Sequence, residues 1–184
     1  MLSRLRFEDR FDAELRQHAL VGTVGYRVAD QTTLQWSLGA LLAGELDTLD
    51  VVYDVRPGFL TSFALSHQWL RETAGFLVTS LSAGVSTTET EAPGGSRARL
   101  TATDIRLSLL LGYTFAEIVS PYLLVRGFGG PIWWDPAGET LRGSDRDHYA
   151  FGAGVVLRRG GLRFSLSGSA LGERSVSAGL SYHF

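Results

Sequence analysis

The residue types that could carry catalysis are sparse in this sequence, and a histidine next to a serine is the clearest case. Ser66 precedes His67, and a serine activated by a histidine is a common nucleophile. If both residues lie on a strand, they point to opposite faces of the sheet and cannot pair directly. Asp147 precedes His148, but no third group completes a catalytic cluster. The sequence therefore predicts no catalytic residue, and we expect the protein not to be an enzyme.

Acidic residues that could hold a cation gather in one segment, at Asp47, Asp50 and Asp54. They lack the glycine and the alternate spacing of a calcium loop, so solvated loop charges are the better interpretation. The chain has no cysteine, which excludes disulfides and thiolate zinc sites. We expect no metal site and no cofactor.

Length and charge limit the class of protein. The 184 residues suit a single domain, residues 1–184. All 17 basic residues are arginine, and the net charge is -2, which argues against general binding to nucleic acid. Apolar stretches such as residues 73–88 are short and interrupted by Ser, Thr or Gly, so none is typical of a transmembrane helix.

Alternation of apolar with polar residues is the dominant pattern of the chain. From Ile105 to Phe115 every second residue is apolar, which predicts a strand whose two faces differ. The same pattern predicts ten strands, near residues 2–11, 18–29, 32–44, 56–70, 74–87, 98–115, 119–133, 147–159, 162–171 and 175–184. The expected fold class is all-β, an antiparallel up-and-down transmembrane β-barrel of ten strands, with eight as the alternative.

The first expected strand also fits a helical stripe, because Phe7, Phe11 and Leu15 are four residues apart. A helix there would leave nine strands, an odd number that bacterial barrels avoid, so parity favours ten. The connections support the same layout. Short links alternate with long polar loops at residues 44–56, 86–99 and 134–148, although two other loops on that side are brief.

Aromatic residues gather at the ends of the expected strands, with aliphatic residues between them. This arrangement is typical of a surface that crosses two lipid–water interfaces, and it favours an outward apolar face over the apolar interior of a soluble lipocalin-like barrel. The expected girdle residues are Tyr26, Trp69, Tyr113, Phe115, Trp133, Trp134, Tyr149 and Phe151.

Charged residues alternate with the apolar set inside several strands. Such charges would be costly in an apolar cavity but can pair with each other in a polar lumen. A barrel of eight to ten strands is about wide enough for side chains to fill it, so we expect a plugged lumen. The expected lumen ionic network is Arg6, Glu8, Asp104, Arg106, Arg126 and Arg163.

The last residues resemble the terminal signal of bacterial outer-membrane β-barrel proteins. The matching positions are Ser177, Gly179, Leu180, Tyr182 and the final Phe184. In that family this strand is the barrel-assembly signal, recognised by the assembly machinery before the sheet closes. In length and layout the chain is similar to the small OmpA/OmpX/OmpW-like type. The resemblance implies a bacterial outer-membrane location, although the first residues contain no signal peptide.

The resulting expectation is a small outer-membrane protein with a structural or surface-interaction role. Its partners would be the lipid bilayer and envelope lipid, together with the assembly machinery during insertion, and we expect a monomer that binds no nucleic acid. One alternative is a narrow channel or carrier for small solutes. Another is an envelope-lipid-modifying enzyme. Residues 145–148 resemble the Asp–His couple of outer-membrane proteases, but the loops here are too short for such a cleft.

Overall fold

The computed structural model describes residues 1–8, 11–48, 51–70, 74–182, and everything below concerns these residues. They form antiparallel strands and one short 3-10 helix, η1 (Pro136–Gly138). The strands are β1 (Leu2–Phe7), β2 (Phe11–Ala29), β3 (Thr32–Thr48), β4 (Val52–Val55), β5 (Gly58–Gln68), β6 (Gly75–Glu91), β7 (Arg97–Tyr113), β8 (Val119–Gly129), β9 (Pro131–Trp134), β10 (Leu141–Asp145), β11 (Tyr149–Arg159), β12 (Leu162–Gly172) and β13 (Ser175–Tyr182). The fold is all-β and up-and-down, as expected.

The described residues form 13 strands rather than the ten expected. The three additional strands are short: β4 and β10 lie in segments expected to be loops, and β9 is separated from β8 at Gly130. A Cβ on Gly130 would lie 2.1 Å from the backbone oxygen of Thr103, so the close approach of two backbones requires glycine there. The first segment is a strand, β1, and not the helix that its apolar spacing also allowed.

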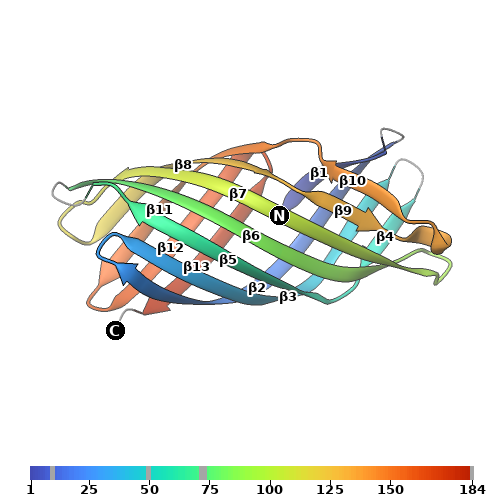
Figure 1. The fold of residues 1–184 in the computed structure, drawn as a ribbon, viewed down its shortest axis with the longest axis horizontal. Helices are drawn as coiled ribbons and strands as arrows, with labels where there is room; N and C mark the ends of the chain where they lie inside the picture. The colour runs from blue at the N-terminus through green and yellow to red at the C-terminus, as the bar shows by residue number, and fades with distance from the viewer. Residues whose placement is uncertain (9–10, 49–50, 71–73, 183–184) are drawn as a thin grey trace.

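Strand pairing closes into a ring at one end of the sheet. Each strand pairs with the next in the order β1, β2, β3, β4, β6, β7, β9, β10, and β10 pairs again with β1. Toward the other end the pairing follows a row of β2, β3, β5, β6, β7, β8, β11, β12 and β13. The long strands β6 and β7 run along much of the long axis and connect the two ends (Figure 1).

The side of the sheet that carries apolar residues changes along a single strand. Near the start of β7, Leu100 is buried in the interior while Arg99 is exposed on the outside. Farther along the same strand, Ile105 and Leu107 are exposed outside while Arg106 lines the interior cavity. Successive residues of a strand alternate between faces, so this reversal requires no change of register.

β2 shows the same reversal, although it lies several strands away from β7. Leu15 is buried in the interior beside an exposed Arg16. Later in the strand, Leu20 and Val24 are exposed outside. The sheet therefore has two parts, one with an apolar interior and the other with an apolar exterior.

We call the first part the core end, because its interior holds a cluster of buried apolar side chains. The cluster comprises Leu5, Phe7, Ala13, Leu15, Leu46, Val55, Ala98, Leu100, Ile132, Trp134 and Leu141. Trp134 is its centre: its ring lies 5.0 Å from that of Tyr53 and 5.6 Å from that of Phe7, and its Nε1 donates to Thr90 Oγ1 at 2.9 Å.

The sequence led us to expect Trp134 in an outer aromatic girdle. The structure corrects this expectation, because Trp134 lies in the interior of the core end. Its side chain is only 2% exposed. The separate strand β9 pairs Trp134 with Leu100 and Leu141, which are both buried residues of the core end. The alternation along β9 thus directs Trp134 inward and leaves the half-buried Trp133 on the other face.

Candidate functional site: an interior ion cluster and an apolar outer belt

An ion cluster lies in the interior, centred on the carboxylate of Glu173. The Glu173 side chain is almost fully buried, at 2% exposure. Its two oxygens lie 3.3 Å from Arg106 Nη2 and 3.6 Å from Arg126 Nη1. Arg106 also pairs with Asp104 on the same strand. One buried carboxylate therefore joins arginines from two neighbouring strands, β7 and β8.

Neighbouring side chains hold the two arginines in place. Arg126 Nε donates to Ser108 Oγ at 3.3 Å, and these residues are directly opposite each other in the β7–β8 ladder. The guanidinium of Arg106 lies 5.6 Å from the ring centre of Phe128, its own ladder partner. Stacking on an aromatic ring suits a guanidinium that is partly removed from water.

The turn between β12 and β13 places Glu173 in the interior. Gly172 has φ +73, and a Cβ there would lie 1.7 Å from the backbone oxygen of Tyr149. Only glycine fits this approach and this conformation. The next backbone oxygen, that of Glu173, accepts a hydrogen bond from Ser169 Oγ at 2.7 Å.

The cluster borders an interior cavity of about 760 Å³. Much of the remaining wall consists of serine side chains, and the core end supplies apolar residues such as Leu5 and Leu100. Asp145 of β10 also lines the cavity, and burial raises its pKa to about 6. The interior therefore offers positive charges, negative charges and hydroxyl groups to a small polar solute.

The expected lumen residues fall into two groups. Asp104, Arg106 and Arg126 come together as described, and Arg163 is half-buried near the start of β12 without joining them. Arg6 and Glu8 differ from the expectation, because both are exposed on the exterior of the core end.

Arg6 pairs with Asp12 at 3.0 Å on that exterior. Glu8 accepts a hydrogen bond from the backbone N–H of Arg142 at 3.5 Å. The reason is the reversal between the two parts of the sheet, because Leu5 and Phe7 take the interior positions of β1. Sequence reasoning also missed Glu173, whose only signal is an acidic residue directly after a glycine in a short link.

The exterior of the other part of the sheet is a continuous set of exposed apolar side chains, which we call the belt. It includes Leu20, Val24, Leu34, Trp36, Leu38, Phe63, Leu65, Leu81, Ile105, Leu107, Leu109, Leu111, Leu123, Val125, Phe164, Leu166, Val176 and Leu180. Six of the expected girdle residues are exposed as well, namely Tyr26, Trp69, Tyr113, Phe115, Tyr149 and Phe151.

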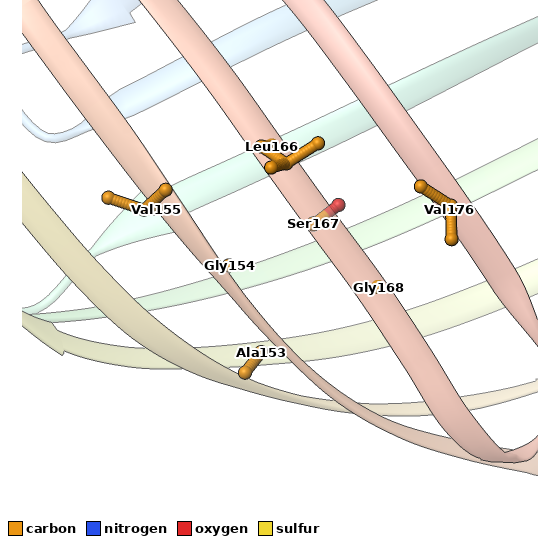
Figure 2. A pocket seen from close by; sticks show the side chains of 7 residues that line it. All are labelled: Ala153, Gly154, Val155, Leu166, Ser167, Gly168 and Val176. Atoms are coloured by element: carbon orange, nitrogen blue, oxygen red, sulfur yellow. The ribbon is translucent and has the colours of Figure 1, made fainter.

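A shallow hollow of about 410 Å³ lies over β11, β12 and β13. Figure 2 shows Val155, Leu166 and Val176 on these three neighbouring strands, with the small residues Gly154 and Gly168 between them. No charged residue lines it, so it is a notch in an apolar surface rather than a polar binding site.

The histidine that follows Ser66 has other partners. Ser66 Oγ donates to Ser80 Oγ at 3.0 Å, whereas His67 Nδ1 shares a hydrogen bond of 2.9 Å with Thr32 Oγ1. The His67 ring also packs edge-on against Trp69, with 4.6 Å between ring centres. Ser66 and His67 therefore do not act as a pair.

The residues that the sequence led us to expect in an assembly signal, Ser177, Gly179, Leu180 and Tyr182, lie on β13. Phe184 lies outside the described residues, as does Asp50 of the acidic segment. The part of the chain that the structure describes holds no group of three or more His, Asp or Glu side chains placed to share a metal ion. It also holds no helix that is long and apolar enough to cross a membrane.

A scan against protein-family models finds no family that matches this chain, and a search of curated proteins finds no match either.

Proposed function

We propose that the chain is a small β-barrel protein of the bacterial outer membrane, with a structural or surface-interaction role. The observation that carries this proposal is the reversal of the apolar side along β2 and β7. Where Leu, Val, Ile and aromatic side chains form the exterior around a charged interior, the outer face suits contact with lipid and the inner face suits polar groups. The core end, with its charged exterior and apolar interior, suits water outside.

The length of the belt fits a bilayer. On β7 the exposed apolar positions run from Ile105 to Tyr113, and on β2 from Leu20 to Val28, about nine residues in each case. A tilted transmembrane strand needs about 9–11 residues. Tyr26 and Tyr113 lie at the end of the belt away from the core end, where an aromatic girdle would meet the lipid–water interface.

Within this proposal, the core end projects from the membrane and supplies the surface for interaction. Its exterior carries ion pairs such as Arg4 with Asp147 at 2.8 Å and Arg97 with Glu91 at 3.0 Å. Envelope lipid would contact the belt, and the assembly machinery would act on β13, as the terminal resemblance implies.

The first experiment is a semi-native gel of the detergent-refolded protein, with and without boiling, together with circular dichroism. A band whose mobility changes on boiling and a strand-rich spectrum are expected for a membrane barrel. A protein that is soluble and monomeric without detergent would contradict the proposal, because the belt would then face water.

A narrow channel or carrier is the second candidate, and the cavity of about 760 Å³ is the observation that favours it. Its charged lining would suit a small polar solute. The buried side chains of the core end oppose free passage at that end. Conductance in planar bilayers separates the two functions: steady single-channel currents would support the channel, and a silent bilayer that contains refolded protein would support the structural role.

A further inference from the structure

Two strand edges in the belt have a neighbour on one side only. Residues Ala19–Ala29 of β2 pair with β3, and residues Val176–Ser181 of β13 pair with β12. Within the described ranges, no strand pairs with the other edge of either segment. We call the space between these two edges the seam.

The residues along the seam are more exposed than those of strands that have a neighbour on both edges. β7 alternates between exposed and half-buried residues, as expected when one face is covered. Residues 18–29 of β2 and 176–182 of β13 are exposed on both faces. Val24 is 72% exposed and Leu180 is 75% exposed. The same interior cavity reaches both edges, since Val21 and Ser177 both line it.

The end of the seam nearest the core end shows how many strands fit between the two edges. Leu2 of β1 is opposite Arg16 of β2 on one side and Arg174 on the other. The N–H of Leu2 donates to Arg174 O at 2.8 Å, and the N–H of Arg174 donates to Leu2 O at 3.1 Å. A single strand therefore fits between β2 and the start of β13 at this level.

Chain direction determines which kind of strand fits. From β2 to β13 the row contains nine strands, each antiparallel to the next. The first and last strands of an odd row run in the same direction, so β2 and β13 cannot form an antiparallel pair with each other. One intervening strand would be antiparallel to both, and β1, which is antiparallel to β2, already has this direction.

We propose that the seam binds one extended strand of a partner polypeptide, antiparallel to β2 and β13 and in line with β1. Edge N–H and C=O groups within a bilayer require hydrogen-bond partners, which a polypeptide backbone supplies and an acyl chain does not. A second copy does not fit if the proposed membrane location holds. Antiparallel pairing of two identical edges would need the copies to insert in opposite directions.

The side chains along the seam define the chemistry of that strand. On the outside it would lie beside Val24, Val176 and Leu180, which favours apolar residues. On the inside it would lie beside Thr23 and Ser177, which favours small polar residues at the alternate positions.

At the end of the seam that is far from β1, an acidic residue is favoured at the inward-facing position of the bound strand. Arg27 of β2 and Arg158 of β11 lie near enough to Arg163 of β12 to repel it. These three arginines make no ion pair within the part of the chain that the structure describes. A carboxylate near the N-terminus of the bound strand would offset this positive charge.

The test uses the full chain refolded in detergent and a synthetic peptide of about eight residues. The peptide alternates Leu or Val with Ser or Thr and has Glu at its first inner position. Hydrogen exchange of the seam-facing amides of β2 and β13 should slow by about tenfold or more when the peptide binds. The control peptide has the same sequence with N-methylated backbone amides and should give no protection.

Protection of only one edge, of neither edge, or equally by the N-methylated peptide would overturn the proposal. A heat-modifiable gel band is independent of the peptide, so failure here is distinguishable from failure of the proposed membrane location.

Cross-linking tests the direction of the bound strand. The chain has no cysteine, so Leu20→Cys and Val28→Cys each introduce one thiol at opposite ends of the seam. A peptide with cysteine near its N-terminus should form a disulfide with the Val28→Cys variant and little with the Leu20→Cys variant. Equal yields, or a preference for Leu20→Cys, would overturn the antiparallel arrangement.

Discussion

The carboxylate of Glu173 lies between the guanidinium groups of Arg106 and Arg126, at 3.3 Å and 3.6 Å. Removal of the Glu173 charge would take this ion pair from Arg126 and leave Arg106 with Asp104 alone. We expect Glu173→Gln to lower the free energy of unfolding by about 3 kcal/mol, because two partly desolvated arginines lose their shared partner. Urea unfolding of the detergent-refolded protein measures this change.

The control for that experiment is Glu89→Gln, which has the same chemical change at an exposed position of β6. Its effect should stay within about 0.5 kcal/mol. If both variants lose the same stability, the interior ion cluster does not contribute as described.

Gly172 offers a second test of the same site through the backbone. Alanine there would need φ near +73, and its Cβ would meet the Tyr149 backbone oxygen at 1.7 Å. We expect Gly172→Ala to cost about 2 kcal/mol or more and to move Glu173 away from the arginines. Gly94→Ala is the matched control, because nothing lies within 4 Å of a Cβ at that position. A Gly172→Ala variant as stable as Gly94→Ala would contradict the turn geometry.

The belt can be tested with two substitutions on one face of one strand. Leu109 and Thr101 both lie on the exterior of β7, in the belt and at the core end respectively. Arginine near the middle of a bilayer costs about 2–4 kcal/mol in a barrel, so Leu109→Arg should impair folding into lipid vesicles. Thr101→Arg should fold nearly as well as the unchanged protein. Equal folding of the two variants would argue against a lipid-facing belt.

We expect Asp145 to make the stability of the protein depend on pH. Its pKa is raised to about 6 by burial and by the nearby carboxylates of Asp104 and Glu173. The folded state therefore holds this proton more tightly than the unfolded state does. Its contribution to stability is fully present below about pH 4 and is lost as the pH rises through about 6.

Urea unfolding measured between about pH 4 and about pH 8 should therefore show a decrease in stability that Asp145→Asn reduces. The asparagine side chain stays neutral over the whole range. A decrease of the same size in Asp145→Asn would show that another group causes it.

The strand pattern of residues 98–115 was predictable from sequence, because alternation shows which residues share a face. It does not show which face is inside. Arg106 and Arg6 both alternate with apolar neighbours, yet Arg106 lines the cavity and Arg6 pairs with Asp12 outside. The difference arises from the environment of each part of the sheet, and a period-two pattern is the same in both.

Glu173 and Trp134 were not predictable for related reasons. The position of Glu173 depends on a glycine turn and on strands that are distant in the sequence, β7 and β8. The position of Trp134 depends on the separate pairing of β9, which begins where the backbone of Gly130 passes close to Thr103. Neither relationship leaves a local periodic signal.

The core end also has a consequence for how such a protein would enter and leave a membrane. Phe7 and Trp134 can pack against each other only after their strands, β1 and β9, have both paired with β10. Once these rings pack, withdrawal requires the packed cluster to be dismantled first. We therefore expect insertion to be followed by a locking step, so that extraction from the bilayer is far slower than entry.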